Sequence, residues 1–461
     1  MRALALLMFV AATVPMAFMR PVIGLMLWIL FSYMNPHRIA YGFATAFPWV
    51  MIVAVVTMVS TMAHSQQRQA LRMTPLMILM TLFLLWTGLS TLDAVVPDQA
   101  EIEWVRFFKI MLMVYFTAIL VTDKQRLHWV LWTIVLSFGF WGFKGGFFTL
   151  ITGGGYNVMG PIKSFYRDTN GFALVMCMCL PLMRYLQLQD HRKWVRLGLW
   201  GLMGLTAVAI VGTYSRGGLL ALGITVLMLI YKSPRRASLF LVIPIMAVLV
   251  ASFMPQEWYS RMNTIDEYQQ DKSAQGRINS WTFAVNVALD DPLLGGGMRV
   301  WSSDAMWDTH GPPDAVHRAI HSIFFQVLGE AGFVGLALFV AMLAGGWFGL
   351  ARIRRKARAG PDTAWMADLA SMMQVSLVAY AAAGSLLPMP YFDLFYQILA
   401  MTTVLHMLLL RAEAGGEQRT VAESPSAAAT HRHPVGRRRP AIGRPLRPDT
   451  QGGGQQDLPW Y

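Results

Sequence analysis

Long apolar runs, separated by short polar loops, constrain the fold of this chain more than any other feature of its sequence. About a dozen of these runs approach the ~20 residues that a helix needs to cross a bilayer. Charged residues make up only 14% of the chain, against roughly 25% in a soluble domain. Backbone groups in lipid must pair within their own segment, and these runs lack the short alternating pattern of barrel strands. We therefore expect an all-α polytopic membrane protein with about 12 transmembrane helices.

The charges between the runs predict which loops face the cytoplasm. Lysine and arginine are enriched in cytoplasmic loops, and the acidic loop Asp93–Glu103, which has neither, is expected on the opposite side. The net charge of +13 is assigned to the basic loops and the tail, so we expect no nucleic-acid partner. The basic loops are residues 64–72, 122–126, 192–196, 232–236 and 352–358.

Changes in composition divide the chain into five parts. The last part is rich in proline, glycine and arginine, which cannot bury a core, and we expect a disordered cytoplasmic tail that touches anionic headgroups. In the first part, residues 3–19 and 21–34 are each short for a full crossing, so a helical hairpin and one broken helix both remain open. The five parts are an N-terminal transmembrane region (1–150), core transmembrane helices (151–254), a large loop outside the cytoplasm (255–320), C-terminal transmembrane helices (321–411) and the tail (412–461).

An amphipathic helix is expected inside the large loop, over Gly276–Leu289. The Asp-Asp-Pro sequence that begins at Asp290 ends it. A helix of this kind lies on the bilayer surface or caps the bundle of spans. Four residues recur at the spacing of one helical face: Ile278, Trp281, Val285 and Ala288.

Cations gather on the side of the membrane that faces away from the basic loops. Arg216 follows a tight turn at the membrane boundary, where a cation is costly unless it reaches headgroups or faces a polar cavity. Both interpretations stay open. Arg277 begins the amphipathic helix. The guanidinium fork matches phosphate oxygens, so converging arginines suit a lipid-linked diphosphate. Four more cations are expected to bind the same group: Lys163, Arg167, Arg299 and Arg318.

The loop of residues 152–170 carries several candidate binding groups. Glycines at 153–155 let the backbone approach a ligand closely, so this loop is either an anion-binding lip or an ordinary flexible turn. Asp168 and Asn170 either position a substrate or cap the helix that begins near Gly171.

His321 lies at or near the first turn of a long helix, where the positive end of the helix dipole favours a neutral imidazole. A neutral imidazole can take a proton from a hydroxyl, while arginines stabilise a diphosphate leaving group without a metal. A plain buried histidine remains an alternative. A metal site is another, because His317 and His321 are four residues apart. No glutamate completes that motif, and the break at residues 311–313 argues against one continuous helix, so we expect neither a metal nor a cofactor.

At these residues the chain resembles the O-antigen ligase and polymerase superfamily of bacterial membrane glycosyltransferases. The matching segments are RDTNGFAL at 167–174, TYSRGGLLAL at 213–222, GRINSWTFAVNVALDDPLLGGGM at 276–298 and HSIFFQVLGEAGFVGLALF at 321–339. The last segment resembles a family helix in which glutamate and glycines follow the histidine, here Glu330, Gly332 and Gly335. Residues 20–43 resemble the branch of exosortase-A-associated O-glycosylation ligases.

The resemblance implies a GT-C-like fold and a metal-independent, inverting glycosyl transfer in the bacterial inner membrane. The donor would be an undecaprenyl-diphosphate-linked glycan on the periplasmic face, bound by Arg216 and Arg277, and His321 would activate the acceptor. Lipid A-core sugar as acceptor makes an O-antigen ligase of lipopolysaccharide biosynthesis. A protein hydroxyl makes an oligosaccharyltransferase, and a second glycan makes a polymerase.

A transporter of lipid-linked glycan is the main rival from a different class. It predicts ionisable residues at mid-bilayer and paired broken helices from internal repeats. The charges here gather at the ends of the runs instead, and no repeat is evident. We therefore favour an enzyme.

Overall fold

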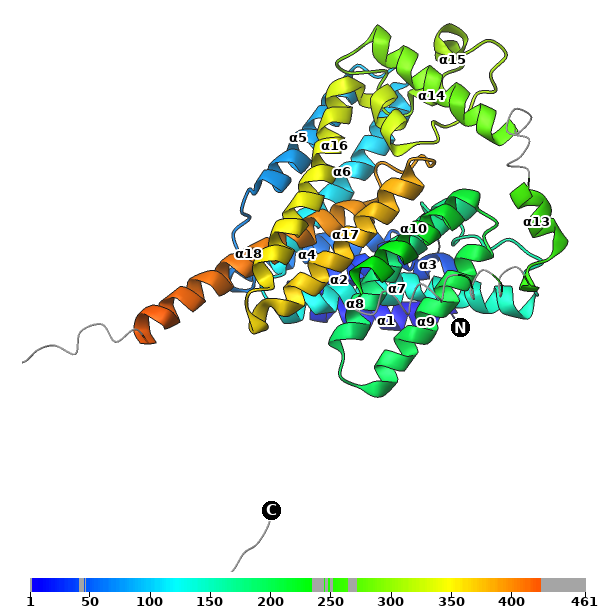
Figure 1. The fold of residues 1–461 in the computed structure, drawn as a ribbon. Helices are drawn as coiled ribbons and strands as arrows, with labels where there is room; N and C mark the ends of the chain where they lie inside the picture. The colour runs from blue at the N-terminus through cyan, green and yellow to red at the C-terminus, as the bar shows by residue number, and fades with distance from the viewer. Residues whose placement is uncertain are drawn as a thin grey trace, which may run out of the picture. The chain divides into compact units, whose positions relative to one another are not determined.

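The computed structural model describes residues 2–40, 45, 47–233, 244, 248, 252–263 and 272–423. Every regular element in these ranges is a helix (Figure 1). Eight helices are long and apolar enough to cross a membrane, which confirms the expected all-α polytopic membrane protein. They are α1 (Arg2–Met19), α5 (Pro75–Leu92), α7 (Lys124–Ile151), α8 (Thr169–Gln189), α9 (Lys193–Val211), α16 (Ile323–Ala357), α17 (Ala364–Gly384) and α18 (Asp393–Glu423).

Shorter or more charged helices occupy further apolar runs. Two of them, α2 (Pro21–Tyr33) and α4 (Trp49–Ala63), are apolar but short. Residues 239–253, an apolar run within the expected core transmembrane helices, fall almost entirely outside the described residues. The remaining helices are α3 (Pro36–Ile39), α6 (Pro97–Leu120), α10 (Arg216–Lys232), α13 (Gln256–Asn263), α14 (Lys272–Asp290) and α15 (Asp304–His310), with the single-turn helices η2 (Ser65–Gln67), η3 (Val300–Ser302) and η4 (Pro361–Thr363).

The N-terminal apolar region forms a helical hairpin rather than one broken helix, because Leu6 and Val10 of α1 pack with Phe31 near the far end of α2. Arg20 has an extended backbone between α1 and α2, and Pro21 opens α2, where its missing N–H costs nothing. Both helices pack against each other and against α4.

Helix α8 is the most enclosed of the candidate spans, because 89% of its apolar membrane-spanning stretch is buried. It packs against α7, α9, α10 and α17 (Figure 1). Its two cysteines, Cys177 and Cys179, are buried and free. Because α8 is fixed on all sides, its N-terminus offers a rigid position for a functional site.

Helix α16 is interrupted inside its first half. Gly332 has a φ of 67° there, a left-handed conformation that favours glycine. A Cβ at this position would lie 2.2 Å from the carbonyl oxygen of Leu293, so the loop after α14 packs directly into the kink. The sequence shows Gly332 but does not predict the interruption, because a glycine within an apolar run also fits a straight helix.

Helix α14 exists and ends at Asp290, as expected, but it begins at Lys272 and the expected apolar face is wrong in part. Ile278, Trp281 and Val285 are only half-buried. The buried face is displaced around the helix because α14 packs against α16 and α15 instead of lying on a flat surface. Its buried apolar residues are Ala274, Phe283, Ala284, Val287 and Ala288.

The last helix, α18, continues past the expected boundary at 411/412. Its helical backbone runs to Glu423, so residues 412–423 continue the helix. The remainder of the expected tail, residues 424–461, lies outside the described residues.

Candidate functional site at the helix N-termini

The N-terminal ends of α8 and α10 lie side by side. Asp168 caps α8 by accepting hydrogen bonds from the backbone N–H groups of Asn170 and Gly171, at 3.0 and 2.9 Å. Capping is therefore one role that Asp168 does have. Ser215 caps α10, and its hydroxyl also donates to Oδ1 of Asn170 at 2.5 Å. Arg216 is the first residue of α10, so this bond brings it beside the first turn of α8.

The N-terminus of α16 is held close to the end of α17. Ser322 caps α16 by accepting from two backbone N–H groups of its first turn. A Cβ placed at Gly384, the last residue of α17, would lie 2.8 Å from the side chain of Ile323, the first residue of α16. Glycine at 384 thus permits this close approach.

The turn that follows α17 contacts the starts of the other two helices. Leu386 lies 3.5 Å from the position of a Cβ on Gly217 in α10, and Met389 lies 3.2 Å from that of Gly171 in α8. Three helix N-termini, of α8, α10 and α16, are therefore gathered around one turn. Each N-terminus carries about half a positive charge, which favours an anion.

Helix α14 carries Arg277 and contacts Arg318 and His321, which precede α16. The indole N–H of Trp281 donates to the carbonyl oxygen of His321 at 3.1 Å, and the Trp281 ring stacks on Phe325. The guanidinium of Arg318 lies against Gly276, where a Cβ would be only 2.0 Å from Nη1. The backbone of α14 therefore helps to hold both His321 and Arg318 in position.

His321 is the electrostatic centre of the group. Its pKa is lowered to about 4, first by burial and then by Arg277 and Arg318, while Asp168 opposes the shift. These four residues come from α14, from the segment before α16 and from the cap of α8, so the structure brings them within electrostatic reach of one another. At neutral pH the imidazole is uncharged.

Arg318 has an unused hydrogen-bond donor. Its Nε is buried and has no partner among the described residues. A buried donor without a partner costs about 1–3 kcal/mol, and a phosphate oxygen would remove that cost. Arg277 and Arg216 are half-buried, which suits side chains that line a polar recess.

Among the described residues, no hydrogen bond or ring contact joins the other expected cations to His321 or to the arginines near it, although Arg167 directly precedes Asp168. Lys163 and Arg167 are exposed on the loop between α7 and α8. Arg299 donates from Nη1 to Glu103 of α6 at 3.2 Å, and its guanidinium lies 4.6 Å from the centre of the Trp301 ring. These contacts give Arg299 a structural connection to α6 and leave its expected role in diphosphate binding untested.

A buried glutamate, Glu330, holds the kink of α16. Its carboxylate accepts hydrogen bonds from the backbone N–H of Arg299, from Gln326 and from Tyr391, at 3.0, 3.0 and 2.8 Å. The hydroxyl of Ser90 donates to its carbonyl oxygen at 2.6 Å. Sequence reasoning named Glu330 only for its resemblance to a family motif. The cost of an acid inside an apolar run would have predicted such partners.

The remaining histidines of the large loop bind separate carboxylates. Nδ1 of His317 lies 2.8 Å from Asp304, and its ring stacks on Trp307. Nε2 of His310 lies 3.4 Å from Asp290. Within the described ranges, no three His, Cys, Asp or Glu residues are grouped as metal ligands would be.

Comparison with known protein families identifies the part of the chain that carries the arginines and His321. Residues 201–340, which contain Arg216, Arg277, Arg318 and His321, match the family described as O-antigen ligase. The chain contains an O-antigen ligase domain. The resemblance seen in the sequence is thereby confirmed at the level of the superfamily, and the exosortase-associated branch stays a prediction.

The rest of the comparison is less informative about activity. Residues 1–191 match a family of unknown function (DUF5935), which includes Asp168 and Asn170. No curated protein matches the chain. The O-antigen ligase domain and the long apolar helices together indicate a multi-pass membrane protein with a ligase-type, glycosyl-transferring role.

Proposed function

We propose that this O-antigen ligase-superfamily protein transfers a glycan from undecaprenyl diphosphate to a hydroxyl of lipid A-core sugar, at the periplasmic face of the bacterial inner membrane. The observation that carries the proposal is the position of His321. It is neutral, it lies within electrostatic reach of Arg277 and Arg318, and it is next to the N-terminus of α16, which is gathered with those of α8 and α10.

The arginines and the helix N-termini form the proposed diphosphate site. Arg216, Arg277 and Arg318 supply forks that bind phosphate oxygens in pairs, and the positive ends of the three helix dipoles add charge of the same sign. In this arrangement the protein neutralises the diphosphate with fixed charges, so the transfer requires no metal.

His321 is the proposed general base. In the resting protein, burial and then the nearby cations lower its pKa to about 4, which keeps it neutral but makes it a weak base. A bound diphosphate offsets the charges of Arg277 and Arg318, and the pKa of His321 then rises. The imidazole thus becomes a stronger base only when the donor is in place.

The proposed reaction is a single displacement with inversion. The acceptor oxygen forms a bond to the anomeric carbon of the donor sugar while the bond from that carbon to the phosphate oxygen breaks. The electron pair stays on undecaprenyl diphosphate, whose new charge the arginines stabilise. The hydroxyl proton passes to His321 and later to water.

The distribution of charge supports the proposed orientation. The N-terminus of α16 belongs to the site, and its other end carries Arg354, Arg355 and Lys356 in its last turn. Basic residues mark the cytoplasmic side, so the site is on the periplasmic side. A lipid-linked donor whose diphosphate lies at the outer leaflet can then reach His321 and the arginines near it.

Two other acceptors and one other class remain as alternatives. The resemblance of residues 20–43 to exosortase-associated ligases favours a protein hydroxyl, and a second glycan would make a polymerase. The test is reconstitution of the purified chain in liposomes with lipid-linked glycan and, in separate reactions, lipid A-core, an acceptor protein or a second glycan. We expect product with lipid A-core. Product with another acceptor alone would reassign the acceptor, and movement of donor across the bilayer without any product would favour a transporter.

A further inference from the structure

A cavity of about 460 Å³ lies at the end of α7 that is remote from His321. Helix α7 begins at this cavity and runs for 28 residues, roughly 40 Å at 1.5 Å per residue, before the loop that leads into the candidate site. The cavity is therefore separate from the proposed transfer site. Its walls come from the break between α1 and α2, from η2 and from the first turns of α7, and they include Arg20, Gln67, Asp123, Arg126 and Trp129.

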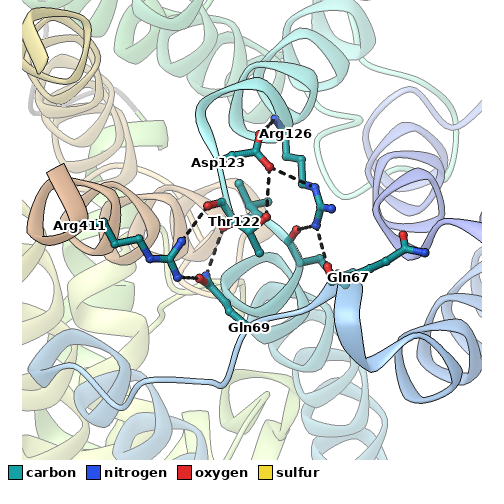
Figure 2. A network of polar contacts seen from close by, with 8 residues as sticks. Gln67, Gln69, Thr122, Asp123, Arg126 and Arg411 are labelled. Atoms are coloured by element: carbon teal, nitrogen blue, oxygen red, sulfur yellow. Dashed lines mark hydrogen bonds and ion pairs between the residues drawn. The ribbon is translucent and has the colours of Figure 1, made fainter. Parts of the chain in front are cut away.

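The walls of the cavity are fixed by a polar network (Figure 2). Nη1 of Arg126 donates to the carbonyl oxygens of Gln67 and Leu120, at 2.7 and 2.9 Å. The side-chain amide of Gln67 donates to the carbonyl oxygen of Met19 at 3.1 Å, which ties the end of α1 to the same wall. Two wall side chains, Arg126 and Gln67, are thus held in place by hydrogen bonds.

A second arginine strengthens this network from the C-terminal side. Figure 2 shows Arg411 of α18 beside Thr122 and Gln69, and its Nη1 donates to the carbonyl oxygen of Thr122 at 2.8 Å. The turn that leads into α7 is therefore held between α18 and η2.

The charges around the cavity leave one cation without compensation. Asp123 is already engaged, because it accepts from the backbone N–H of Arg126 at 2.9 Å, from Nε of Arg126 at 3.3 Å and from the hydroxyl of Thr122 at 3.1 Å. The side chain of Arg20 is exposed, and it has no hydrogen bond or ion pair with any described residue. An anion in the cavity would meet this free guanidinium.

The surroundings favour a lipid as the source of that anion. Trp129 is 36% exposed, and Phe18 and Met19 at the end of α1 are 48% and 68% exposed. An indole next to arginine is typical of the membrane interface, and the exposed apolar side chains offer a path for acyl chains. Volumes of about 300–1,000 Å³ are usual for small-molecule sites, so a phosphate headgroup fits.

We propose that this cavity binds the phosphate headgroup of an anionic phospholipid, with Arg20 as its principal ligand. Pockets of this kind, basic and set between helices on the cytoplasmic side, recognise anionic lipids. The lipid would fasten the start of α7 to the break between α1 and α2, at the end of the bundle opposite to glycan transfer.

The test compares the full chain with Arg20→Gln and with a matched control, Arg72→Gln. Arg72 is also exposed at a basic loop on the same side, but it is not part of the cavity wall. Each protein is placed in nanodiscs of phosphatidylcholine alone and in nanodiscs that also contain phosphatidylglycerol. We measure the Tm of each protein. Native mass spectrometry then measures the lipid that stays bound after the protein is released from the nanodisc. A third sample adds inorganic phosphate to phosphatidylcholine nanodiscs.

We expect phosphatidylglycerol to raise the Tm of the wild type and of Arg72→Gln, and both proteins to retain the lipid. In Arg20→Gln most of the rise in Tm and of the retained lipid should be lost. An unchanged Tm of Arg20→Gln in pure phosphatidylcholine shows that the variant is folded. An equal rise in all three proteins would overturn the proposal. A rise produced by inorganic phosphate alone would overturn the lipid as the ligand.

Discussion

His321 owes its neutral state mainly to burial, and then to the guanidinium groups of Arg277 and Arg318. The sequence argument predicted a neutral imidazole from the helix dipole, so the state was foreseen but its largest causes were not. Burial depends on packing between distant segments, which no local pattern reports. Residue type alone predicts Arg318 as a diphosphate ligand, which stays a prediction, whereas its buried donor without a partner is visible only in the structure.

The pH dependence of transfer provides a test at this scale. A base works in its neutral form, so the rate falls as the pH drops through its pKa. For the free protein this pKa is about 4, and kcat/KM should fall only near that pH. With donor bound, the diphosphate raises the pKa, so kcat should fall at a higher pH. Steady-state kinetics across the acid range would measure the pH at which kcat/KM and kcat each decline. A decline of both at the same pH would contradict the proposed effect of the donor on the pKa of His321.

Replacement of Arg318 by glutamine tests the diphosphate site. A hydrogen bond to a charged group contributes about 1.5–3 kcal/mol, so the dissociation constant of the donor should rise on the order of 10- to 100-fold. The matched control is Arg192→Gln, because Arg192 forms a surface pair with Asp190 at the other end of α8. Equilibrium binding of a lipid-linked diphosphate glycan is the measurement. Equal affinity in both variants would remove Arg318 from the site.

Helix α14 acts at the scale of an element by presenting its backbone to the site. It carries Arg277, it holds the carbonyl oxygen of His321 through Trp281, and it leaves space for Arg318 at Gly276. The existence and the end of this helix were predictable, because Asp-Asp-Pro is a strong stop signal. Its buried face was predicted wrongly in part, since α15 and α16 pack on it from the side. The kink of α16 was not predicted, because it depends on the contact with Leu293.

Gly276→Ala separates stability from function in α14. A Cβ would lie 2.0 Å from Nη1 and 2.2 Å from Cζ of Arg318, so the guanidinium must move. Alanine favours a helix by about 1 kcal/mol over glycine, and we expect an equal or higher Tm together with weaker donor binding. The control is Gly201→Ala in α9, where a Cβ meets nothing within 4 Å. Thermal unfolding and donor titration measure the two effects, and unchanged donor binding in Gly276→Ala would refute the role of this space.

At the scale of the whole molecule, the basic loops lie at one end of the long helices, and the arginines near His321 lie at the other end. The spans and the basic ends followed from hydropathy and from the positive-inside pattern, since both are local properties of the sequence. The hydrogen bond between Ser215 and Asn170 and the electrostatic effect of Asp168 on His321 both join segments far apart in the chain. Such meetings depend on the packing of whole helices, and sequence reasoning reached them only through residue type and family resemblance.

Single-turnover transfer by His321→Ala, after donor has been bound in proteoliposomes, tests the central claim most directly. Removal of the base should lower the rate of transfer on the order of 10²- to 10⁴-fold. Donor affinity should be retained, because Arg216, Arg277 and Arg318 remain. The retained affinity also reports that the site is still folded. Transfer at the wild-type rate by His321→Ala, with donor bound normally, would contradict the assignment of His321 as the base.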